Sequence, residues 1–405
     1  MNNLSVLCLA VAGLSACNGS NSKSSETANA SSRSNAAEKP NIVIILTDDQ
    51  GYGDMKCYGN SRLQTPNLDQ LAAEGIRFTN FYAGAAASTP SRAALLTGRY
   101  AERAGLQGVV DDLSVNGLES DEFTLADYLK QNNYATGIFG KWHLGCLPEH
   151  LPLRHGFNEF FGLPYSNDMW PFHPQPGHPY RALPLYDNER VVEYNPTVNH
   201  MTTRITERAT AFIDKHKNEP FLLYVPYTQP HVPLGVSDKF KGKSGEGLYA
   251  DVIMEIDWSV GEIMKTLKEN GLDDHTLVLF TSDNGPWLSY GNHGGSTGGL
   301  REGKGTTFEG GQRVPFIARM PGRIPAGKVS EQFLSALDIT PTIVELTGSQ
   351  MPRMNEFDGE NVWMTLTGQA QSHKPFYFLY DGKVEAVRDG KWKCVAPHEY
   401  RIVTE

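Results

Sequence analysis

The chain has 405 residues, a formal net charge of -10 and 5 cysteines. The length suits one large α/β domain with a small appendage. The negative charge excludes binding to nucleic acid or to an anionic membrane through a general basic surface. Because two of the cysteines fall within the first 17 residues, the remaining odd number does not describe a disulfide scaffold.

The first segment, residues 1–17, has the pattern of a secretory signal peptide. Its apolar run from Leu4 to Ala16 is too short to span a bilayer and ends in small residues. The closing letters LSAC resemble a bacterial lipobox, in which Cys17 would carry lipid. Residues 18–39, rich in Ser, Asn and Ala, are expected to form a flexible tether. We therefore expect an exported protein, a periplasmic or outer-membrane or cell-surface lipoprotein of a bacterium, with membrane contact only through this anchor.

Continuous apolar runs predict strands that are buried on both faces of a parallel sheet. These runs begin at Asn41, Tyr134, Pro220 and Thr276. Helical patterns lie between them, including one with Thr65 as its N-cap and Pro66 at its first position, and another from Leu125. This alternation predicts an α/β fold with a large, mostly parallel central sheet flanked by helices.

The stretch ASTPSRAALLTGRY predicts a short helix, with Thr89 as its cap, Pro90 as its first residue and Gly98 closing it. Arg92 falls in the first turn. A helix N-terminus with an arginine beside it is a natural site for a tetrahedral anion. The sequence places no base next to Ser88, so a plain serine nucleophile lacks its usual activation.

Polar side chains follow each predicted strand. In parallel sheets ligands bind beyond the carboxyl ends of the strands, so these side chains should gather at one edge. The side chains are those of Asp48 and Asp49, Lys141 and His143, His231, and Asp283 and Asn284. Acid and amide residues also make ordinary turns after strands. Two such pairs favour a site for a hard cation such as Ca²⁺ or Mg²⁺ over Zn²⁺.

Two further segments extend this outline. Residues 165–196 are rich in Pro, His, Asn and Tyr, lack periodicity, and are expected to form long loops over the polar edge. Residues 373–405 alternate like a small antiparallel sheet.

The segment Ser88-Thr89-Pro90-Ser91-Arg92 is similar to the C/S-x-P-S-R signature of the type I (formylglycine-dependent) sulfatases, arylsulfatase-like enzymes of the alkaline phosphatase superfamily. Further family blocks occur in order: Thr47-Asp48-Asp49, GKWHLG from Gly140, Pro230-His231-Val232-Pro233-Leu234, Ser282-Asp283-Asn284-Gly285 and Gly303-Lys304-Gly305-Thr306-Thr307. The resemblance covers the chain from Pro40 onward. It implies a sulfatase catalytic domain over residues 40–372 and a partial C-terminal subdomain over 373–405, since similar sulfatases usually continue beyond this point.

The family implies that Ser88 is oxidised to formylglycine, whose aldehyde hydrates to a geminal diol. A diol oxygen held on a divalent cation is acidified by the metal, which replaces the missing base. By the same resemblance, Ca²⁺ in preference to Mg²⁺ would be held by Asp48, Asp49, Asp283, Asn284 and the modified Ser88.

The resemblance also implies roles for the remaining cationic and imidazole side chains. Arg92 would orient the modified residue, and Lys141, His231 and Lys304 would contact the sulfate oxygens and stabilise charge in the transition state. His143 would deprotonate the second diol hydroxyl, and His231 would protonate the leaving alcohol.

The implied activity is hydrolysis of a sulfate monoester on an aryl group or a sugar, with a sulfated small molecule or polysaccharide as substrate. Position 88 is Ser where many relatives have Cys, so the formylglycine-generating machinery would have to be of the serine-modifying, oxygen-independent kind. Two alternatives stay open. One is a phosphate or phosphonate ester hydrolase of the same superfamily, and the other is a non-catalytic lipoprotein that binds sulfated glycans if Ser88 is unmodified.

Overall fold

The computed structural model describes residues 39–174, 180–350 and 357–401. The predicted signal peptide at 1–17, with its lipobox-like end, lies outside these residues, as does the predicted tether apart from Lys39. Within the described ranges, no helix combines the length and the apolar character needed to cross a membrane.

The strands are β1 (Asn41–Thr47), β2 (Ile76–Tyr82), β3 (Ala135–Lys141), β4 (Glu159–Leu163), β5 (Pro184–Asp187), β6 (Arg190–Tyr194), β7 (Phe221–Pro226), β8 (Thr276–Ser282), β9 (Arg313–Arg319), β10 (Lys328–Ser335), β11 (Phe376–Tyr380), β12 (Lys383–Asp389) and β13 (Trp392–Val395). The α-helices are α1 (Pro66–Ala73), α2 (Ser88–Thr97), α3 (Leu125–Gln131), α4 (Met201–His216), α5 (Leu248–Glu269), α6 (Glu309–Gln312), α7 (Ile339–Leu346) and α8 (Trp363–Leu366). Short 3-10 helices are η1 (Lys56–Tyr58), η2 (Pro148–His150), η3 (Pro152–Arg154), η4 (Val198–His200), η5 (Asp273–His275), η6 (Leu288–His293) and η7 (Ala336–Asp338).

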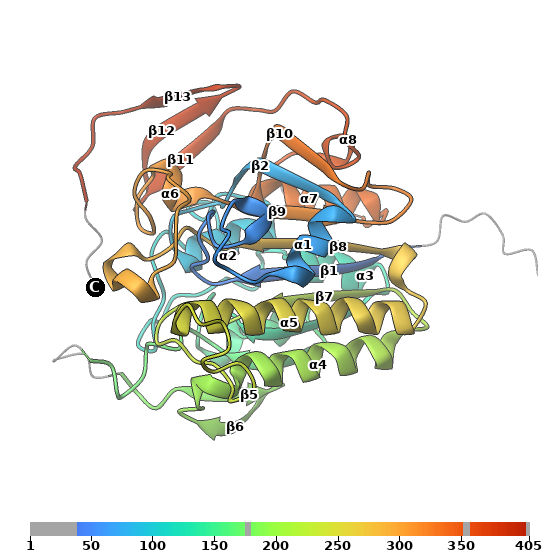
Figure 1. The fold of residues 1–405 in the computed structure, drawn as a ribbon, viewed down its shortest axis with the longest axis vertical. Helices are drawn as coiled ribbons and strands as arrows, with labels where there is room; N and C mark the ends of the chain where they lie inside the picture. Colours follow the sequence, from blue (N-terminus) through green and yellow to red (C-terminus); the bar gives the residue numbers. More distant parts are fainter. Residues whose placement is uncertain (1–38, 175–179, 351–356, 402–405) are drawn as a thin grey trace, which may run out of the picture. The chain divides into compact units, whose positions relative to one another are not determined.

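The central sheet has the strand order β10-β2-β9-β8-β1-β7-β3-β4-β5-β6 (Figure 1). Strands β8, β1, β7, β3 and β4 run parallel, with Ile44 of β1 paired to Tyr224 of β7 and to Leu279 of β8. Strands β9 and β5 run antiparallel to their neighbours. The predicted mostly parallel sheet is confirmed, and the predicted apolar runs form β1, β3, β7 and β8.

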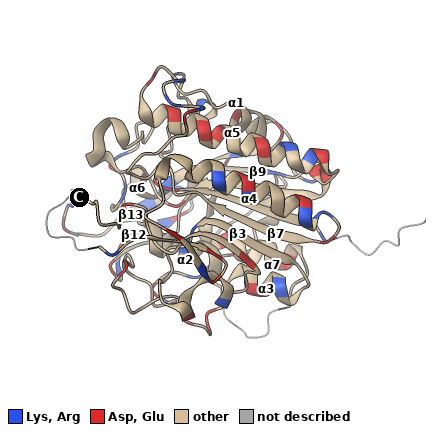
Figure 2. Ribbon diagram, turned by 90° about the horizontal axis from the view of Figure 1, so that it is seen from below, with Lys and Arg blue, Asp and Glu red and all other residues tan. Residues whose placement is uncertain are grey.

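Helices cover both faces of this sheet. Successive side chains of a strand point to opposite faces, and those of β1 are apolar on both, so each face needs a covering layer. From β1, Ile44 and Leu46 pack with residues of α2, α3 and α7, whereas Val43 and Ile45 pack with residues of α1, α4 and α5. Helices α4 and α5 lie side by side (Figure 1). Figure 2 shows charged residues recurring along α4 and α5, which cover one face of the sheet. Strand β7, inside the sheet, carries no charged residue.

Helix α2 begins at Ser88, one residue before the predicted cap. Its flanking residue is Ala87, and the predicted capping function of Thr89 is wrong. The Thr89 hydroxyl instead accepts a hydrogen bond from the backbone N–H of Val110 at 3.2 Å. Gly98 closes the helix with φ 69, in the left-handed region that favours glycine, as predicted.

Helix α1 starts as predicted, with Pro66 in its first turn and Thr65 before it. The Thr65 hydroxyl, however, accepts a hydrogen bond from the backbone N–H of Lys56 at 3.0 Å, so it serves the preceding loop. In both helices the threonine hydroxyl that was predicted to cap the helix accepts a hydrogen bond from a backbone N–H outside the helix.

The prediction that residues 165–196 form only loops is wrong for their second half. Strands β5 and β6 extend the sheet at its edge as an antiparallel pair. Every other residue of β6 is exposed, so the edge strand lacks the apolar run by which a buried strand is recognised.

The predicted antiparallel sheet in the tail is confirmed as β11, β12 and β13. Phe376 and Phe378 pack with Tyr82 of β2 and Ala94 of α2 in one apolar cluster. The tail sheet therefore contacts the helix that begins with Ser88.

Candidate functional site

The polar residues predicted at the strand ends do meet at the carboxyl edge of the parallel strands. Asp48 and Asp49 follow β1, Lys141 ends β3, His231 follows β7, and Asp283 follows β8. All of these side chains are buried, and Asp48 and Lys141 are 0% exposed. Such burial of charged groups requires partners within the site.

Ser88 lies at the centre of this group, at the start of α2. Its hydroxyl donates to Asp48 Oδ1 at 3.1 Å and accepts from Lys141 Nζ at 3.3 Å. The same ammonium group donates to Asp48 Oδ2 at 2.6 Å and to Ser166 Oγ at 3.2 Å. The serine oxygen is thus held between a carboxylate and an ammonium group.

Arg92 connects three elements of the site. Its Nε and Nη2 donate to Asp283 Oδ2 at 3.0 and 2.7 Å, and its Nη1 donates to the carbonyl oxygen of Lys141 at 2.9 Å. Burial alone would lower the pKa of Arg92, but Asp283 and Asp48 raise it above its ordinary value. A permanently charged guanidinium with these partners holds α2 against the ends of β3 and β8.

Asp49 forms the second half of the site. Its carboxylate accepts from Asn284 Nδ2 at 2.7 Å and from Lys304 Nζ at 2.8 Å, while His231 Nε2 lies 3.5 Å from Oδ2. Its backbone N–H donates to Asp283 Oδ1 at 3.1 Å. These contacts join most of the residues predicted from sequence into one connected network: Asp48, Asp49, Ser88, Arg92, Lys141, His231, Asp283, Asn284 and Lys304.

The buried oxygen and nitrogen atoms of this network fit a divalent cation. Ligand atoms of Asp48, Asp49 and His231 lie within 4.8 Å of one another. Asn284 Oδ1 is buried and has no hydrogen-bond partner among the described residues. A buried carbonyl oxygen without a donor is an orphaned acceptor, which a hard cation would satisfy.

The charged groups alter one another's protonation. Burial alone would raise the pKa of Asp48, but Lys141, His231 and Arg92 lower it below its ordinary value. Burial lowers the pKa of Lys141, and nearby Asp48 offsets part of that shift. Asp48 is therefore a carboxylate at neutral pH.

His143 also lies in the site, two residues beyond β3. Its Nε2 is 2.9 Å from the carbonyl oxygen of Val110, which can only accept, so Nε2 carries the proton. Its Nδ1 is buried without a hydrogen-bond partner in the part of the chain that the structure describes. Burial, with Lys141 and Arg92 nearby, holds the pKa of His143 well below its usual value. Neutral His143 thus has one free acceptor nitrogen.

Two residues beside this network, Ser166 and Asp168, are not among the residues predicted from sequence. Ser166 accepts from Lys141, and the carboxylate of Asp168 lies near His231 and Lys304. The ring of Trp287 lies 4.2 Å from Lys304 Nζ. Ser166 and Asp168 lie in the aperiodic segment, residues 165–196, that was expected to cover the polar edge. The composition of that segment predicts its position over the site but does not single out these two residues.

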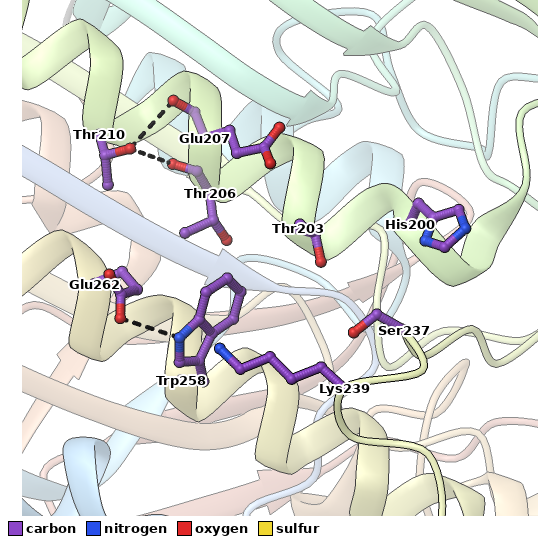
Figure 3. Close-up of a pocket in the computed structure, with 9 residues that line it drawn as sticks. All are labelled: His200, Thr203, Thr206, Glu207, Thr210, Ser237, Lys239, Trp258 and Glu262. Atoms are coloured by element: carbon purple, nitrogen blue, oxygen red, sulfur yellow. Dashed lines mark hydrogen bonds between the residues drawn. The ribbon is translucent and has the colours of Figure 1, made fainter.

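A cavity of about 390 Å³ lies elsewhere, between α4 and α5 (Figure 3). In it Lys239 Nζ lies 3.9 Å from the ring of Trp258, whose Nε1 donates to Glu262 at 3.1 Å. Its walls contain none of the site residues predicted from sequence. The chemistry-bearing residues and this cavity are therefore separate features.

The family follows from a match over most of the chain. Residues 40–349 match the family model for sulfatases. The chain belongs to the sulfatase family. Residues 303–404 of this sulfatase also match the C-terminal part of N-sulphoglucosamine sulphohydrolase.

Arylsulfatase A of Bos taurus is 43% identical to this sulfatase over 382 residues, which cover 89% of this chain and 75% of that protein. N-acetylgalactosamine-6-sulfatase of Canis lupus familiaris is 38% identical over 379 residues, covering 89% and 72%. The solved structure of Ps i-CgsB in complex with k-i-k-neocarrahexaose aligns with a TM-score of 0.79 and 34% identity, covering 88% of this chain and 84% of that chain.

This sulfatase is therefore an arylsulfatase-like sulfuric ester hydrolase of the alkaline phosphatase superfamily, and it hydrolyses sulfate esters. The predicted family, fold class and enzyme class are confirmed. The catalytic and metal-binding roles of individual residues stay predictions.

Proposed function

We propose that this sulfatase hydrolyses sulfate monoesters of aryl or carbohydrate substrates through a formylglycine at position 88 and a bound divalent cation. The observation that carries the proposal is the position of Ser88 Oγ, 3.1 Å from Asp48 Oδ1 and 3.3 Å from Lys141 Nζ. This places the oxygen beside both a cation ligand and a cationic group.

The donor set supports calcium as the cation. Asp48, Asp49, Asp283 and Asn284 would hold it together with modified Ser88, and Ca²⁺ accepts about six to eight oxygen ligands. Asn284 Oδ1 has no hydrogen-bond partner within the described residues and would serve as one of the ligand atoms. A bound divalent cation supplies a Lewis acid that lowers the pKa of an attached hydroxyl group.

The surroundings of Ser88 also fit formylglycine. When formed, formylglycine supplies a hydrated aldehyde with one hydroxyl for attack and a second that can lose a proton. Asp48, which follows β1, and Lys141, which ends β3, already contact the single oxygen of serine. Ser88 therefore stands where the modified residue would act.

Charge in the site favours an anionic substrate once a divalent cation is bound. The carboxylates of Asp48, Asp49 and Asp283 pair with Lys141, Lys304 and Arg92. A divalent cation would shift this balanced group to net positive charge. Lys141 and Lys304 would then stabilise sulfate oxygens in the transition state, while Arg92 holds α2 in place.

The two histidines support a division of proton transfer. Neutral His143 would accept a proton at Nδ1, since its Nε2–H is bonded to Val110. The Nδ1 of His231 donates to the carbonyl oxygen of Val232. The leaving alcohol would take a second proton of this ring, held on Nε2, the nitrogen near Asp49.

The substrate we propose is a sulfated small molecule or polysaccharide. The names of the related proteins, arylsulfatase A and N-acetylgalactosamine-6-sulfatase, support aryl and sugar sulfates respectively. The complex of Ps i-CgsB with k-i-k-neocarrahexaose supports an oligosaccharide.

Paired substrates test the reaction. Purified, modified enzyme should hydrolyse 4-nitrophenyl sulfate with a kcat/KM roughly 100-fold or more above that for 4-nitrophenyl phosphate, as expected for a site that discriminates in its transition state. A larger value for the phosphate would favour the phosphate or phosphonate ester hydrolase and reject the proposal. Activity on neither ester, with Ser88 unmodified, would favour the glycan-binding lipoprotein.

We also propose that the enzyme is an exported bacterial lipoprotein anchored through Cys17, with serine-modifying formylglycine machinery as its partner. The support is the segment ending in LSAC and the polar stretch that follows. In the native host, Cys17→Ser should move the protein from the membrane fraction to the soluble fraction. An unchanged membrane fraction would contradict the anchor.

A further inference from the structure

A short turn over the site carries a carboxylate that the proposed reaction does not use. The backbone N–H of Met169 donates to the carbonyl oxygen of Ser166 at 3.2 Å and closes this turn. Ser166 accepts from Lys141, and Asn167 Nδ2 donates to the carbonyl oxygen of Pro233 at 3.4 Å. The turn is thus held between the ammonium group of the site and the segment after His231.

The carboxylate of Asp168 interacts electrostatically with the cationic side chains of the site. Burial alone would raise the pKa of Asp168, but His231, a hydrogen bond from Ser166, Lys141 and Lys304 lower it. Its Oδ1 is buried and has no hydrogen-bond partner within residues 39–174, 180–350 and 357–401. One oxygen of an ionised carboxylate is therefore left without a donor.

An unpaired buried carboxylate oxygen is destabilising, and it also repels an approaching sulfate group. The sulfate group of an ester offers acceptor oxygens only, so it cannot satisfy Asp168. A plain aryl leaving group has no donor either. A sugar carries hydroxyl groups beside its sulfate ester, and each can donate.

The residues that follow Asp168 suit a sugar as well. Trp170 and Phe172 form an edge-to-face pair with ring centres 5.1 Å apart, and Phe172 is 66% exposed. Apolar rings beside a few well-placed polar groups are typical of small-molecule sites. The described side chains grouped as candidate cation ligands are Asp48, Asp49 and His231, a set without Asp168.

We propose that Asp168 accepts a hydrogen bond from a substrate hydroxyl close to the sulfate ester and thereby selects carbohydrate sulfates over aryl sulfates. The inference rests on the proposed sulfatase function. It makes Asp168 a specificity residue that binds substrate without transferring a proton. The substrate class is accordingly an O-sulfated sugar with a free hydroxyl near the ester.

The test compares enzyme variants with substrate analogues. A panel of monosaccharide O-sulfates identifies a sugar that wild-type enzyme cleaves, and 4-nitrophenyl sulfate serves as the aryl substrate. In Asp168→Ala, kcat/KM for the sugar should fall about 10- to 100-fold further than for the aryl sulfate, the range for a hydrogen bond to a charged group. Wild-type enzyme should lose a similar factor on one deoxy analogue of the sugar, and Asp168→Ala should lose little on that analogue.

Controls separate this role from a structural one. Asp168→Asn keeps the shape and an acceptor oxygen, so it serves if the alanine variant does not fold and should lose less on the sugar. Asp238→Ala removes one charge at an exposed position and should not change the ratio. The inference would be overturned if Asp168→Ala lost kcat/KM equally on both substrates, or if this variant lost as much on the deoxy analogue as wild-type enzyme does. It would also be overturned if wild-type enzyme cleaved aryl sulfates but no sugar sulfate. Wild-type inactivity on every sulfate would instead reject the proposed function.

Discussion

Replacing Ser88 with alanine is expected to abolish turnover of 4-nitrophenyl sulfate, with a fall in kcat on the order of 10⁵-fold or more. Alanine has no oxygen that could be oxidised or could attack sulfur. The variant should still fold, because Lys141 and Asp48 keep their mutual 2.6 Å contact when the hydroxyl is removed. Enzyme from the native host should show a loss of two hydrogens in the peptide that contains Ser88, measured by tandem mass spectrometry.

The matched control is Ser237→Ala, which removes a buried serine hydroxyl from the wall of the cavity between α4 and α5. That variant should keep wild-type turnover. The formylglycine proposal fails if active enzyme carries intact serine at position 88, or if Ser88→Ala retains more than about a tenth of the activity.

Replacing Asp283 is expected to have the second large effect, on both activity and stability. Asp283→Ala removes the main partner of Arg92 and leaves that guanidinium with Asp48 Oδ1 at 3.5 Å. Removing one member of a buried ion pair should destabilise the protein by about 3–5 kcal/mol. Asp283→Asn keeps the shape of the side chain, so its turnover should fall on the order of 10³-fold with a smaller loss of stability.

Three measurements would characterise these variants: the thermal melting temperature, the steady-state turnover, and the bound calcium content determined by elemental mass spectrometry. Asp274→Asn is the matched control, since it changes an exposed acid at the opposite end of β8. Full turnover of Asp283→Asn after exhaustive chelation would show that Asp283 does not hold a required cation.

Several features of the site were predictable because strand direction is a local property. Apolar runs such as NIVIILT and TLVLFTS indicate strands buried on both faces, and the acids after them must then lie at one edge of a parallel sheet. Asp48 and Asp283 meet there despite their separation in sequence. The polar edge therefore follows from the direction of the strands and from the polarity of the residues after them.

Helix caps and strands at the sheet edge were predicted less well, because they depend on which distant groups compete for a hydrogen bond. Thr89 has the chemistry of a helix cap, yet its hydroxyl accepts from Val110 of a distant loop. Residues of β6 pair at the sheet edge with alternate side chains exposed, so no apolar run marks them.

The sequence by itself determined the sheet type, the family and the set of polar residues at the strand ends, since local patterns encode burial and direction. Tertiary structure decided how those residues are paired and protonated. Arg92 meets Asp283 across 191 positions, and Val110 determines which nitrogen of His143 is free. Tertiary structure likewise decides that Oδ1 of Asp168 is buried without a partner in the described residues, because contacts between distant segments determine which donors reach an acceptor.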